Sequence, residues 1–588
     1  MRSSRALAVV RSPESVRRIP QASWVLPLSP RVRAPPDRLV AHRPEDLLNE
    51  ADFREIESRA REVAQGWWEA TPPSAFTWRK LNVASCFTYE LRFVARDVLK
   101  ASWILKAAIE RSGAGALVTD VPPLHDVIPP YPYMSAVGSI LEDLASSSGL
   151  RLERLDATEA ASRPPRSRAL IKAYATVAAR QAMPRLRAGR LIVGIGPFPD
   201  SYGPIAREWS KRQGSMVVAS SIRAPLRANA SVGLYFVPFE AFVSRDDRDE
   251  MQSFIAAAVN STPAALPPHL RFDALDGWEK VFLGDVRRRL QRDLPILACL
   301  RVAFGRGLEK AARLLLMETL SPASKAAVAC ARDSGIPVVV LQHGVIANAA
   351  VHRETDAECI ASWGTLDAAW FSSNLARSTR VEPTGNPRYD DLSVPRKRPV
   401  HPALRGIPAG SRILLFASSP FGHAVATDSL WNHDALQSAA VDAIRRIKEA
   451  YLLFKRHPAE RPGPLPGTSS GSDERVKEVV GGDTFSLIRA SEVVLSMGST
   501  VALEAMILDR PVIFLGPPHP DSPFHPPEDG GGLRALRGDD LGGFVSRLMA
   551  DARFRAETLR GQREYLRRYY TPVDGHAADR VVEFLIRG

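Results

Sequence analysis

The sequence predicts an α/β protein with two Rossmann-like domains, each a mostly parallel sheet covered by helices, facing each other across a cleft. Two observations lead to this prediction. Short apolar runs alternate with amphipathic stretches along almost all of the 588 residues, which is typical of parallel sheets with helices on both faces. A basic, proline-rich stretch, SVPRKRPVHPALRGIPAGS at 393–411, interrupts the alternation and has the composition of a linker.

In the first half, the apolar runs predict strands and the stretches between them predict helices. Strands are expected near 6–10, 23–28, 115–120, 190–196, 215–221, 233–238 and 314–320. Helices are expected over 46–66, 84–112, 131–148, 203–213, 248–260, 277–310 and 321–335. The last of these opens with Ser321 and a proline and closes on Gly335, which are common start and stop residues of helices.

A second series of strands and helices follows the linker. Strands are expected over 412–419, 451–458, 475–480, 492–496 and 511–516, and helices over 433–449, 483–490, 500–508 and from about 539 to the end. We therefore expect an N-terminal domain over 1–345 on the acceptor side and an interdomain connection over 346–411. A C-terminal nucleotide-donor domain should cover 412–570, and a last helix over 571–588 should return toward the N-terminal domain.

Composition restricts the class of protein. A hydrophobic content of 45% and a charged content of 24% are those of a soluble globular protein. No apolar run approaches the ~20 residues needed to cross a bilayer, and the first residues do not form a signal peptide, so we expect a cytoplasmic protein. The four cysteines are widely spread without a C-x-x-C pair, which predicts ordinary thiols and no metal site.

The net charge of +13, carried mostly by arginine, favours anionic partners such as nucleotide donors or phospholipid headgroups. The arginines are scattered and no nucleic-acid motif is present, so nucleic acid is not an expected partner. One local cluster, DVRRRLQRDL at 285–294, is followed by the apolar PILACLRVAF. This segment is either a solvated helix face or a contact with a membrane surface.

The stretch IPVVVLQHGV at 336–345 predicts a buried central strand that ends on Gln342, His343 and Gly344. In parallel sheets the carboxyl end of such a strand opens into the ligand crevice. His343 is therefore expected in the cleft as a general base or phosphate ligand, with a packed core histidine as the alternative. Asp120 and Asp200 each follow an apolar strand and are further candidates for the base, with Asp120 preferred by position.

The segment SEVVLSMGSTVALEAMILDRPVIFLG at 491–516 predicts an anion site. Ser499 and Thr500 stand at the start of a helix, where exposed amides and the helix dipole favour negative charge. Glu504 follows Thr500 by four residues on the same face, in an otherwise apolar helix where a carboxylate needs a partner. The two hydroxyls of a ribose would serve; the alternative is an ion pair with an arginine such as Arg510.

Two further strand ends carry candidate nucleotide ligands. In FKRHPAE, Lys455 and His457 follow an apolar strand and can hold phosphates and stabilise a leaving group. In FASSPFGH, Ser418 and Ser419 offer contacts to phosphate or base. No cofactor is expected apart from a nucleotide-sugar as co-substrate.

The segments VVVLQHGV, TGNPRYDDL, FKRHPAE, SMGSTVALEAMILDRPVIFLG and DGHAADRV resemble the bacterial surface-polysaccharide GT-B enzymes over about 310–588. That group includes capsule glycosyltransferases, Kdo-transferases and CDP-glycerol glycerophosphotransferases. The resemblance implies nucleotide binding by His457, Ser499, Thr500 and Glu504, a catalytic His343, and no bound metal. The chain has QHG where the glycerophosphotransferases have WHG, and it lacks the paired acidic motif of sialyltransferases, so the donor stays open.

The expected function is transfer of a sugar from a nucleotide-activated donor to a cell-surface or capsular glycan, on a glycan or lipid-linked acceptor. The enzyme is expected in the cytoplasm, with peripheral contact at the inner face of the membrane as an option. Alternatives of the same fold are a CDP-polyol phosphate transferase and a UDP-sugar 2-epimerase. An alternative of another class is a non-catalytic scaffold in glycan assembly.

Overall fold

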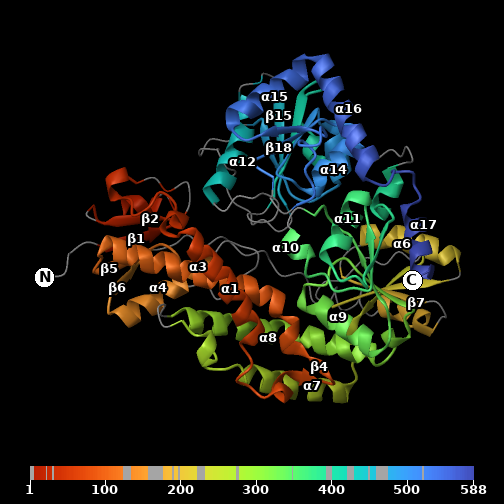
Figure 1. Ribbon diagram of the computed structural model, residues 1–588, viewed down its shortest axis with the longest axis horizontal. Helices are drawn as coiled ribbons and strands as arrows, with labels where there is room; N and C mark the ends of the chain where they lie inside the picture. The colour runs from red at the N-terminus through yellow and green to blue at the C-terminus, as the bar shows by residue number, and fades with distance from the viewer. Residues whose placement is uncertain are drawn as a thin grey trace.

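The chain folds around three parallel sheets covered by helices (Figure 1). The predicted α/β class with parallel-sheet domains is confirmed, and one more sheet is present than the sequence pattern separated. The computed structural model describes residues 6–122, 134–155, 177–221, 232–392, 400–419, 430–457 and 474–587, apart from short gaps at 13, 22, 29–31, 33, 188–190, 197–198, 213, 273–276, 347–348, 446, 448–449 and 519–521.

The C-terminal sheet has six strands in the order β16-β15-β14-β17-β18-β19. Because β14 comes first in the chain and lies in the middle, this is the Rossmann order, with a switch point between β14 and β17. The strands are β14 (Arg412–Ala417), β15 (Ala450–Lys455), β16 (Val476–Val479), β17 (Val493–Ser496), β18 (Val512–Leu515) and β19 (Leu533–Ala535). Its helices are α12 (Leu430–Arg445), α13 (Thr484–Ala490), α14 (Thr500–Ile507), α15 (Gly538–Ala550) and α16 (Ala552–Tyr569).

The middle sheet has seven strands in the order β13-β12-β11-β10-β7-β8-β9. Its first six strands in the chain repeat the Rossmann order, with the switch point between β7 and β10, and β13 extends one edge. The strands are β7 (Leu191–Ile195), β8 (Ser215–Ser220), β9 (Leu234–Pro238), β10 (Arg313–Leu316), β11 (Val338–Leu341), β12 (Cys359–Ser362) and β13 (Arg380–Pro383). Its helices include α6 (Pro199–Lys211), α7 (Arg245–Asn260), α8 (Trp278–Phe304), α9 (Pro322–Asp333), α10 (Ala349–His352) and α11 (Thr365–Asn374).

The expected connection over 346–411 is only in part a connection. Strands β12 and β13 and helix α11 fall within it and complete the middle sheet. Each of these strands has four residues, and β13 reads RVEP, so neither carries a long apolar run. Of the expected linker, 393–399 lies outside the described residues, whereas Leu404 and Ile407 pack against the apolar core of the C-terminal sheet.

The N-terminal sheet has four parallel strands in the order β2-β1-β5-β6. These are β1 (Ala6–Val10), β2 (Trp24–Pro27), β5 (Ala116–Thr119) and β6 (Arg151–Arg154). The sequence pattern missed β6 because RLER is a polar edge strand. Helices α1 (Glu50–Gly66), α3 (Thr88–Ser112) and α4 (Met134–Ser148) cover the sheet, and α3 continues onto α8 of the middle unit.

Helix α8 corrects the expectation of a membrane-facing segment at 285–304. Asp285 and Arg289 are buried and their side chains lie 2.5 Å apart, while Arg289 also bonds to Glu90 at 2.7 Å. The apolar stretch that follows packs in the core, including Leu294 and Leu297. The segment therefore holds α3 and α8 together and offers no apolar surface. Within the described residues, no helix is long and apolar enough to span a bilayer.

The last helix, α17 (Ala577–Arg587), lies beside α6 on the middle sheet (Figure 1). Val581 and Phe584 join the apolar cluster on that face of the sheet. Asp390, which follows β13, accepts hydrogen bonds from the amides of Ala577 and Ala578 at 2.9 and 2.8 Å. The chain therefore passes from the C-terminal sheet back to the middle sheet, and a carboxylate fixes the start of the returning helix.

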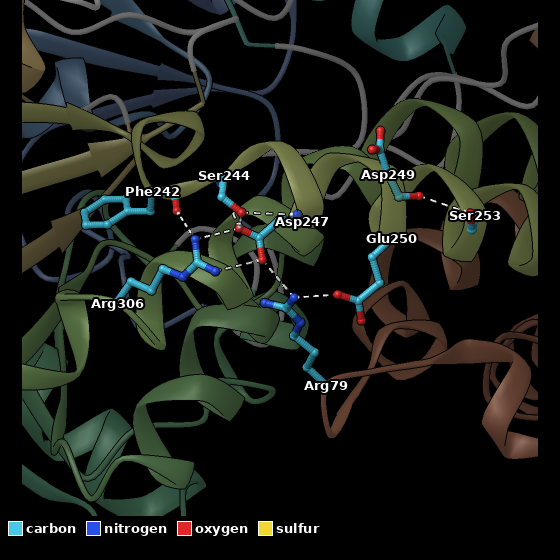
Figure 2. A network of polar contacts seen from close by, with 8 residues as sticks. All are labelled: Arg79, Phe242, Ser244, Asp247, Asp249, Glu250, Ser253 and Arg306. Atoms are coloured by element: carbon cyan, nitrogen blue, oxygen red, sulfur yellow. Dashed lines mark hydrogen bonds and ion pairs between the residues drawn. The ribbon is translucent and has the colours of Figure 1, made fainter.

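A polar network ties a hairpin to the middle unit. The short strands β3 (Thr77–Trp78) and β4 (Leu81–Asn82) form a hairpin whose tip residue Arg79 has φ 45°. Figure 2 shows Arg79 and Arg306 converging on Asp247 at the start of α7, with contacts of 2.8 and 2.6 Å. Burial opposes the charge of Asp247, but hydrogen bonds from Ser244 and the two arginines hold its pKa well below the usual range.

Candidate nucleotide-binding and active site

Three strand ends of the C-terminal sheet stop at the same level beside its switch point. In the sheet register, Ala417 of β14 lies opposite Lys455 of β15 on one side and Ser496 of β17 on the other. The residues that follow these strands therefore share one edge. The predicted nucleotide ligands Ser418, Ser419, Lys455, His457, Ser499 and Thr500 all stand at this carboxyl edge, where ligands bind in open α/β sheets.

The serine at the end of β14 positions its neighbour. The Ser418 hydroxyl accepts a hydrogen bond from the His457 amide at 3.3 Å, and the Ser418 amide donates to the Lys455 carbonyl at 3.0 Å. Ser418 and Ser419 are both buried. Ser418 thus fixes the backbone that carries the imidazole, and the His457 side chain is only partly covered. The proline after His457 and the turn from 420 lie outside the described residues.

The start of α14 leaves its first amides available. Ser499 precedes the helix but makes no side-chain cap bond; its hydroxyl lies 3.1 Å from that of Ser496 instead. Both Ser499 and Thr500 are partly exposed. Uncapped amides together with the helix dipole suit an anion such as a phosphate, as the sequence predicts.

Glu504 has a protein partner that the sequence analysis did not name. Its side chain is 2% exposed, and its Oε1 accepts a hydrogen bond from Arg388 Nη1 at 2.8 Å. Arg510, the partner considered from the sequence, donates to the Arg489 carbonyl at 2.6 Å instead. Burial raises the pKa of Glu504, and the charges of Arg388 and Lys455 oppose that rise.

His343 is exposed at the end of β11 and is not packed in the core. Its Nδ1 lies 2.7 Å from the Met317 carbonyl, at the end of the neighbouring strand β10. That contact orients the ring and leaves Nε2 to face outward, an arrangement typical of a histidine that transfers protons. The ring of His352 lies 6.5 Å away, and burial, followed by the effect of His343, lowers the pKa of His352 to about 3.

Gln342 holds the backbone on which His343 stands. Its Nε2 donates to Asp367 Oδ2 at 3.0 Å and to the Gly344 carbonyl at 2.9 Å, and its Oε1 accepts from the Trp363 amide at 2.8 Å. The Trp363 indole donates to the Gln342 carbonyl at 2.7 Å. Asp367 is fully buried, which raises its pKa to about 7. The segment QHG is thus fixed by side chains from the start of α11.

Two hydrogen bonds join this segment to the C-terminal sheet. The Val345 amide donates to the Thr500 hydroxyl at 3.3 Å, and the Ser522 hydroxyl donates to the Ile346 carbonyl at 2.5 Å. A Cβ added at Gly344 would lie 3.4 Å from the Thr500 hydroxyl oxygen, so glycine permits the close approach. The histidine-bearing strand end of the middle sheet therefore meets the start of α14.

Asp120 does not join this arrangement. It lies in the N-terminal sheet, 4% exposed, and accepts hydrogen bonds from the Arg11 and Ser12 amides at 2.8 and 2.7 Å and from the Ser15 hydroxyl at 2.8 Å. These contacts give Asp120 a structural role in holding the loop after β1, and its placement does not support the expected catalytic role. Asp200 lies exposed in the first turn of α6, after β7.

The sequence analysis missed three residues that shape the site. Arg388 follows an asparagine and a proline in TGNPRYDDL, a segment quoted for its resemblance without any role given to the arginine. Asp367 and His352 are single polar residues in apolar surroundings, and only the fold reveals their neighbours. Within the described ranges, no group of three histidine, cysteine, aspartate or glutamate side chains could hold a metal ion, and all four cysteines are buried thiols.

No family model and no curated protein matches the chain. Solved structures with a similar fold include the MnaA protein of S. aureus with UDP, at 12% identity and a TM-score of 0.43 over 68% of this chain and 96% of that chain. The UDP-GlcNAc 2-epimerase from Neisseria meningitidis bound to UDP-GlcNAc is 12% identical, with a TM-score of 0.39 over 68% of this chain and 100% of that chain. The glycosyltransferase SnogD from Streptomyces nogalater is 17% identical, with a TM-score of 0.33 over the same shares.

Proposed function

We propose that the chain is a GT-B-type glycosyltransferase that takes a nucleotide-activated sugar as donor and a glycan or lipid-linked acceptor of the cell surface or capsule. It would act in the cytoplasm and without a resident metal. The observation that carries the proposal is the bond between Thr500 and Val345. It places the exposed His343 next to the helix start and strand ends that suit a nucleotide.

The donor would lie along the carboxyl edge of the C-terminal sheet. The α14 amides, Lys455 and His457 would hold its phosphates, since cations and uncapped amides favour oxyanions. The Glu504 carboxylate would accept hydrogen bonds from the ribose hydroxyls while Arg388 balances its charge. In this arrangement Arg388 keeps Glu504 ionised in a buried position.

His343 would remove a proton from the acceptor hydroxyl as that oxygen forms its bond to the anomeric carbon of the donor. The bond from that carbon to the nucleotide phosphate would break, and the electron pair would leave with the phosphate. Lys455 and His457 would stabilise the charge that develops there. Gln342 would keep the histidine backbone in place during the reaction.

A UDP-sugar 2-epimerase is the second candidate, because an exposed histidine opposite a nucleotide site could equally move a proton on a sugar carbon. The N-terminal sheet and its helices favour the transferase. They form a third unit, which a reaction on a single nucleotide-sugar does not require and which a large acceptor could occupy. CDP-polyol phosphate transfer and a non-catalytic scaffold are decided by the same experiment.

The experiment is a thermal-shift screen of the full chain against UDP-, CDP-, CMP- and GDP-sugars and CDP-glycerol, followed by incubation with the compound that stabilises it. Sugar transferred only when an acceptor glycan is present supports the transferase. A C2 epimer formed without acceptor identifies the epimerase, and transfer of glycerol phosphate identifies the polyol phosphate enzyme. Stabilisation by none of the compounds contradicts the proposal and favours the scaffold.

A further inference from the structure

A second cavity, of about 320 Å³, lies between α14, the end of α16 and the segment after β13. Leu503 and Ile507 of α14 form one wall, and Leu566, Tyr570 and Val573 form another. Trp363 and Tyr389 close it on the side of the middle sheet. The cavity thus occupies the place where the chain crosses between the two Rossmann-like units. It shares none of its lining residues with the predicted nucleotide ligands.

Two tyrosine hydroxyls in its lining lack a protein partner. Tyr389 is 4% exposed, and neither its hydroxyl nor that of Tyr570 makes a hydrogen bond within the part of the chain that the structure describes. Buried polar groups are rarely left without a partner. Because both rings line the same cavity, a ligand that brings an oxygen between them would supply the missing bonds.

The charges around the cavity select against an anion. Asp390 lines it, with both carboxylate oxygens bonded to the amides at the start of α17. Asp367, buried and bonded to Gln342, lies close enough to Tyr570 to act on its ionisation. Arg567, the cation in the lining, is exposed and paired with Glu564 at 2.5 Å. The interior is therefore apolar, with two neutral hydroxyls and carboxylates nearby.

We propose that this cavity binds an uncharged, mainly apolar small molecule whose hydroxyl or carbonyl oxygen bonds to the Tyr389 and Tyr570 hydroxyls. The molecule would touch Trp363, whose amide and indole both donate to Gln342. Occupation of the cavity would therefore contact the residue that holds the backbone of His343. This site is separate from the proposed nucleotide site and does not depend on which donor is used.

The test uses the full chain and 2-naphthol, a neutral molecule with one hydroxyl, in a calorimetric titration at neutral pH. We expect one molecule bound per chain. The charged analogue 2-naphthoate should bind at least about tenfold more weakly, because a carboxylate would enter an apolar site beside Asp367 and Asp390. Absence of 2-naphthol binding, or equal binding of the two compounds, overturns the proposal.

Variants locate the binding. Tyr389→Phe should weaken 2-naphthol binding by about three- to tenfold through the loss of one hydrogen bond, while the melting temperature stays the same or rises because an unpaired hydroxyl is removed. Tyr569→Phe, on α16 but outside the lining, is the matched control and should change neither quantity. Unchanged affinity in Tyr389→Phe overturns the role given to the hydroxyl.

Filling the cavity should abolish binding. Ile507→Trp places a large ring in it, and Val573→Phe does so from the opposite wall if the first variant fails to fold. Lys455→Ala, at the proposed nucleotide site, should leave 2-naphthol binding intact. Binding that survives in a folded filling variant, or that disappears in Lys455→Ala, overturns the proposal without bearing on nucleotide binding itself.

Discussion

Arg388 Nη1 lies 2.8 Å from Glu504 Oε1, across the boundary between the segment after β13 and helix α14. Arg388 also stacks on Phe485, with its guanidinium carbon 5.0 Å from the ring centre. The pair therefore links the chain that leaves the middle sheet to the helix expected to bind the nucleotide. It explains how a carboxylate can stay in an apolar helix before any ligand is bound.

Replacing Arg388 by methionine should lower the free energy of unfolding by about 1–3 kcal/mol, because Glu504 stays buried without its partner. Burial already raises the pKa of Glu504, and loss of the cation should raise it further. The loss should therefore be largest at neutral pH and fade as the pH falls through the pKa of Glu504, where the carboxyl becomes neutral.

The double variant Arg388→Met with Glu504→Gln is the control for this pair. It should recover most of the lost stability in denaturant titrations, since no buried charge remains. Additive losses in the two single variants would contradict a direct pairing.

Glu504→Gln alone should weaken nucleotide-sugar binding by about 1–3 kcal/mol, since hydrogen bonds from ribose to a charged acceptor are lost. The fold should survive, because glutamine has the same size. Calorimetry with the donor identified by the thermal-shift screen measures the change. An unchanged affinity would leave Glu504 with a purely structural role beside Arg388.

Asp120→Ala should destabilise the N-terminal sheet, because three donors lose their shared acceptor. A loss of about 2–4 kcal/mol is expected from removal of a buried carboxylate with several bonds. Turnover per folded molecule and nucleotide affinity should stay close to wild type at low temperature. A large fall in turnover with normal stability would instead restore the catalytic role expected from the sequence.

Asp247→Asn should cost about 2–4 kcal/mol at neutral pH, because Arg79 and Arg306 lose a buried counter-charge (Figure 2). The pKa of Asp247 is depressed in the folded state, so its contribution is present above the unfolded value of about 3.9 and is lost as the pH falls below it. Denaturant titrations of both proteins at several pH values should converge below about pH 4. A constant difference across that range would contradict the charged interaction.

Long apolar runs made most of the fold predictable. Strands such as β11 and β17 are buried on both faces, so their sequences are continuously apolar. The elements that sequence missed are short or polar: β6 lies at an edge, and β13 has four partly covered residues. The division between the N-terminal and middle sheets was also missed, since strand order depends on contacts between distant segments.

The candidate site was predictable where each residue follows a strand. Lys455, His457 and Ser499 share one sheet edge because parallel strands end together, and His343 meets that edge through Gly344. Asp120 satisfied the same rule but belongs to another sheet. Arg388 followed no such rule, because it reaches Glu504 from a 3-10 turn at 387–392 that only the packing of the two units brings close.

His343→Ala should lower turnover by about 10²–10⁴-fold, the usual value of a positioned proton transfer. Nucleotide affinity and melting temperature should change little, since the ring is exposed at a strand end. Gln342→Met, which loosens the same backbone, should lower turnover less. A variant that melts early yet keeps near-normal turnover at low temperature would assign His343 a structural role.

The most direct test of the nucleotide site is a calorimetric titration of the stabilising nucleotide-sugar into the wild-type chain and into Lys455→Ala. Lys455 ends β15 beside Ser418, where the proposed site places the phosphates. The account predicts that Lys455→Ala binds at least about tenfold more weakly, through loss of a charged hydrogen bond, with an unchanged melting temperature. Equal affinity in the two proteins would contradict a nucleotide site at the carboxyl edge of the C-terminal sheet.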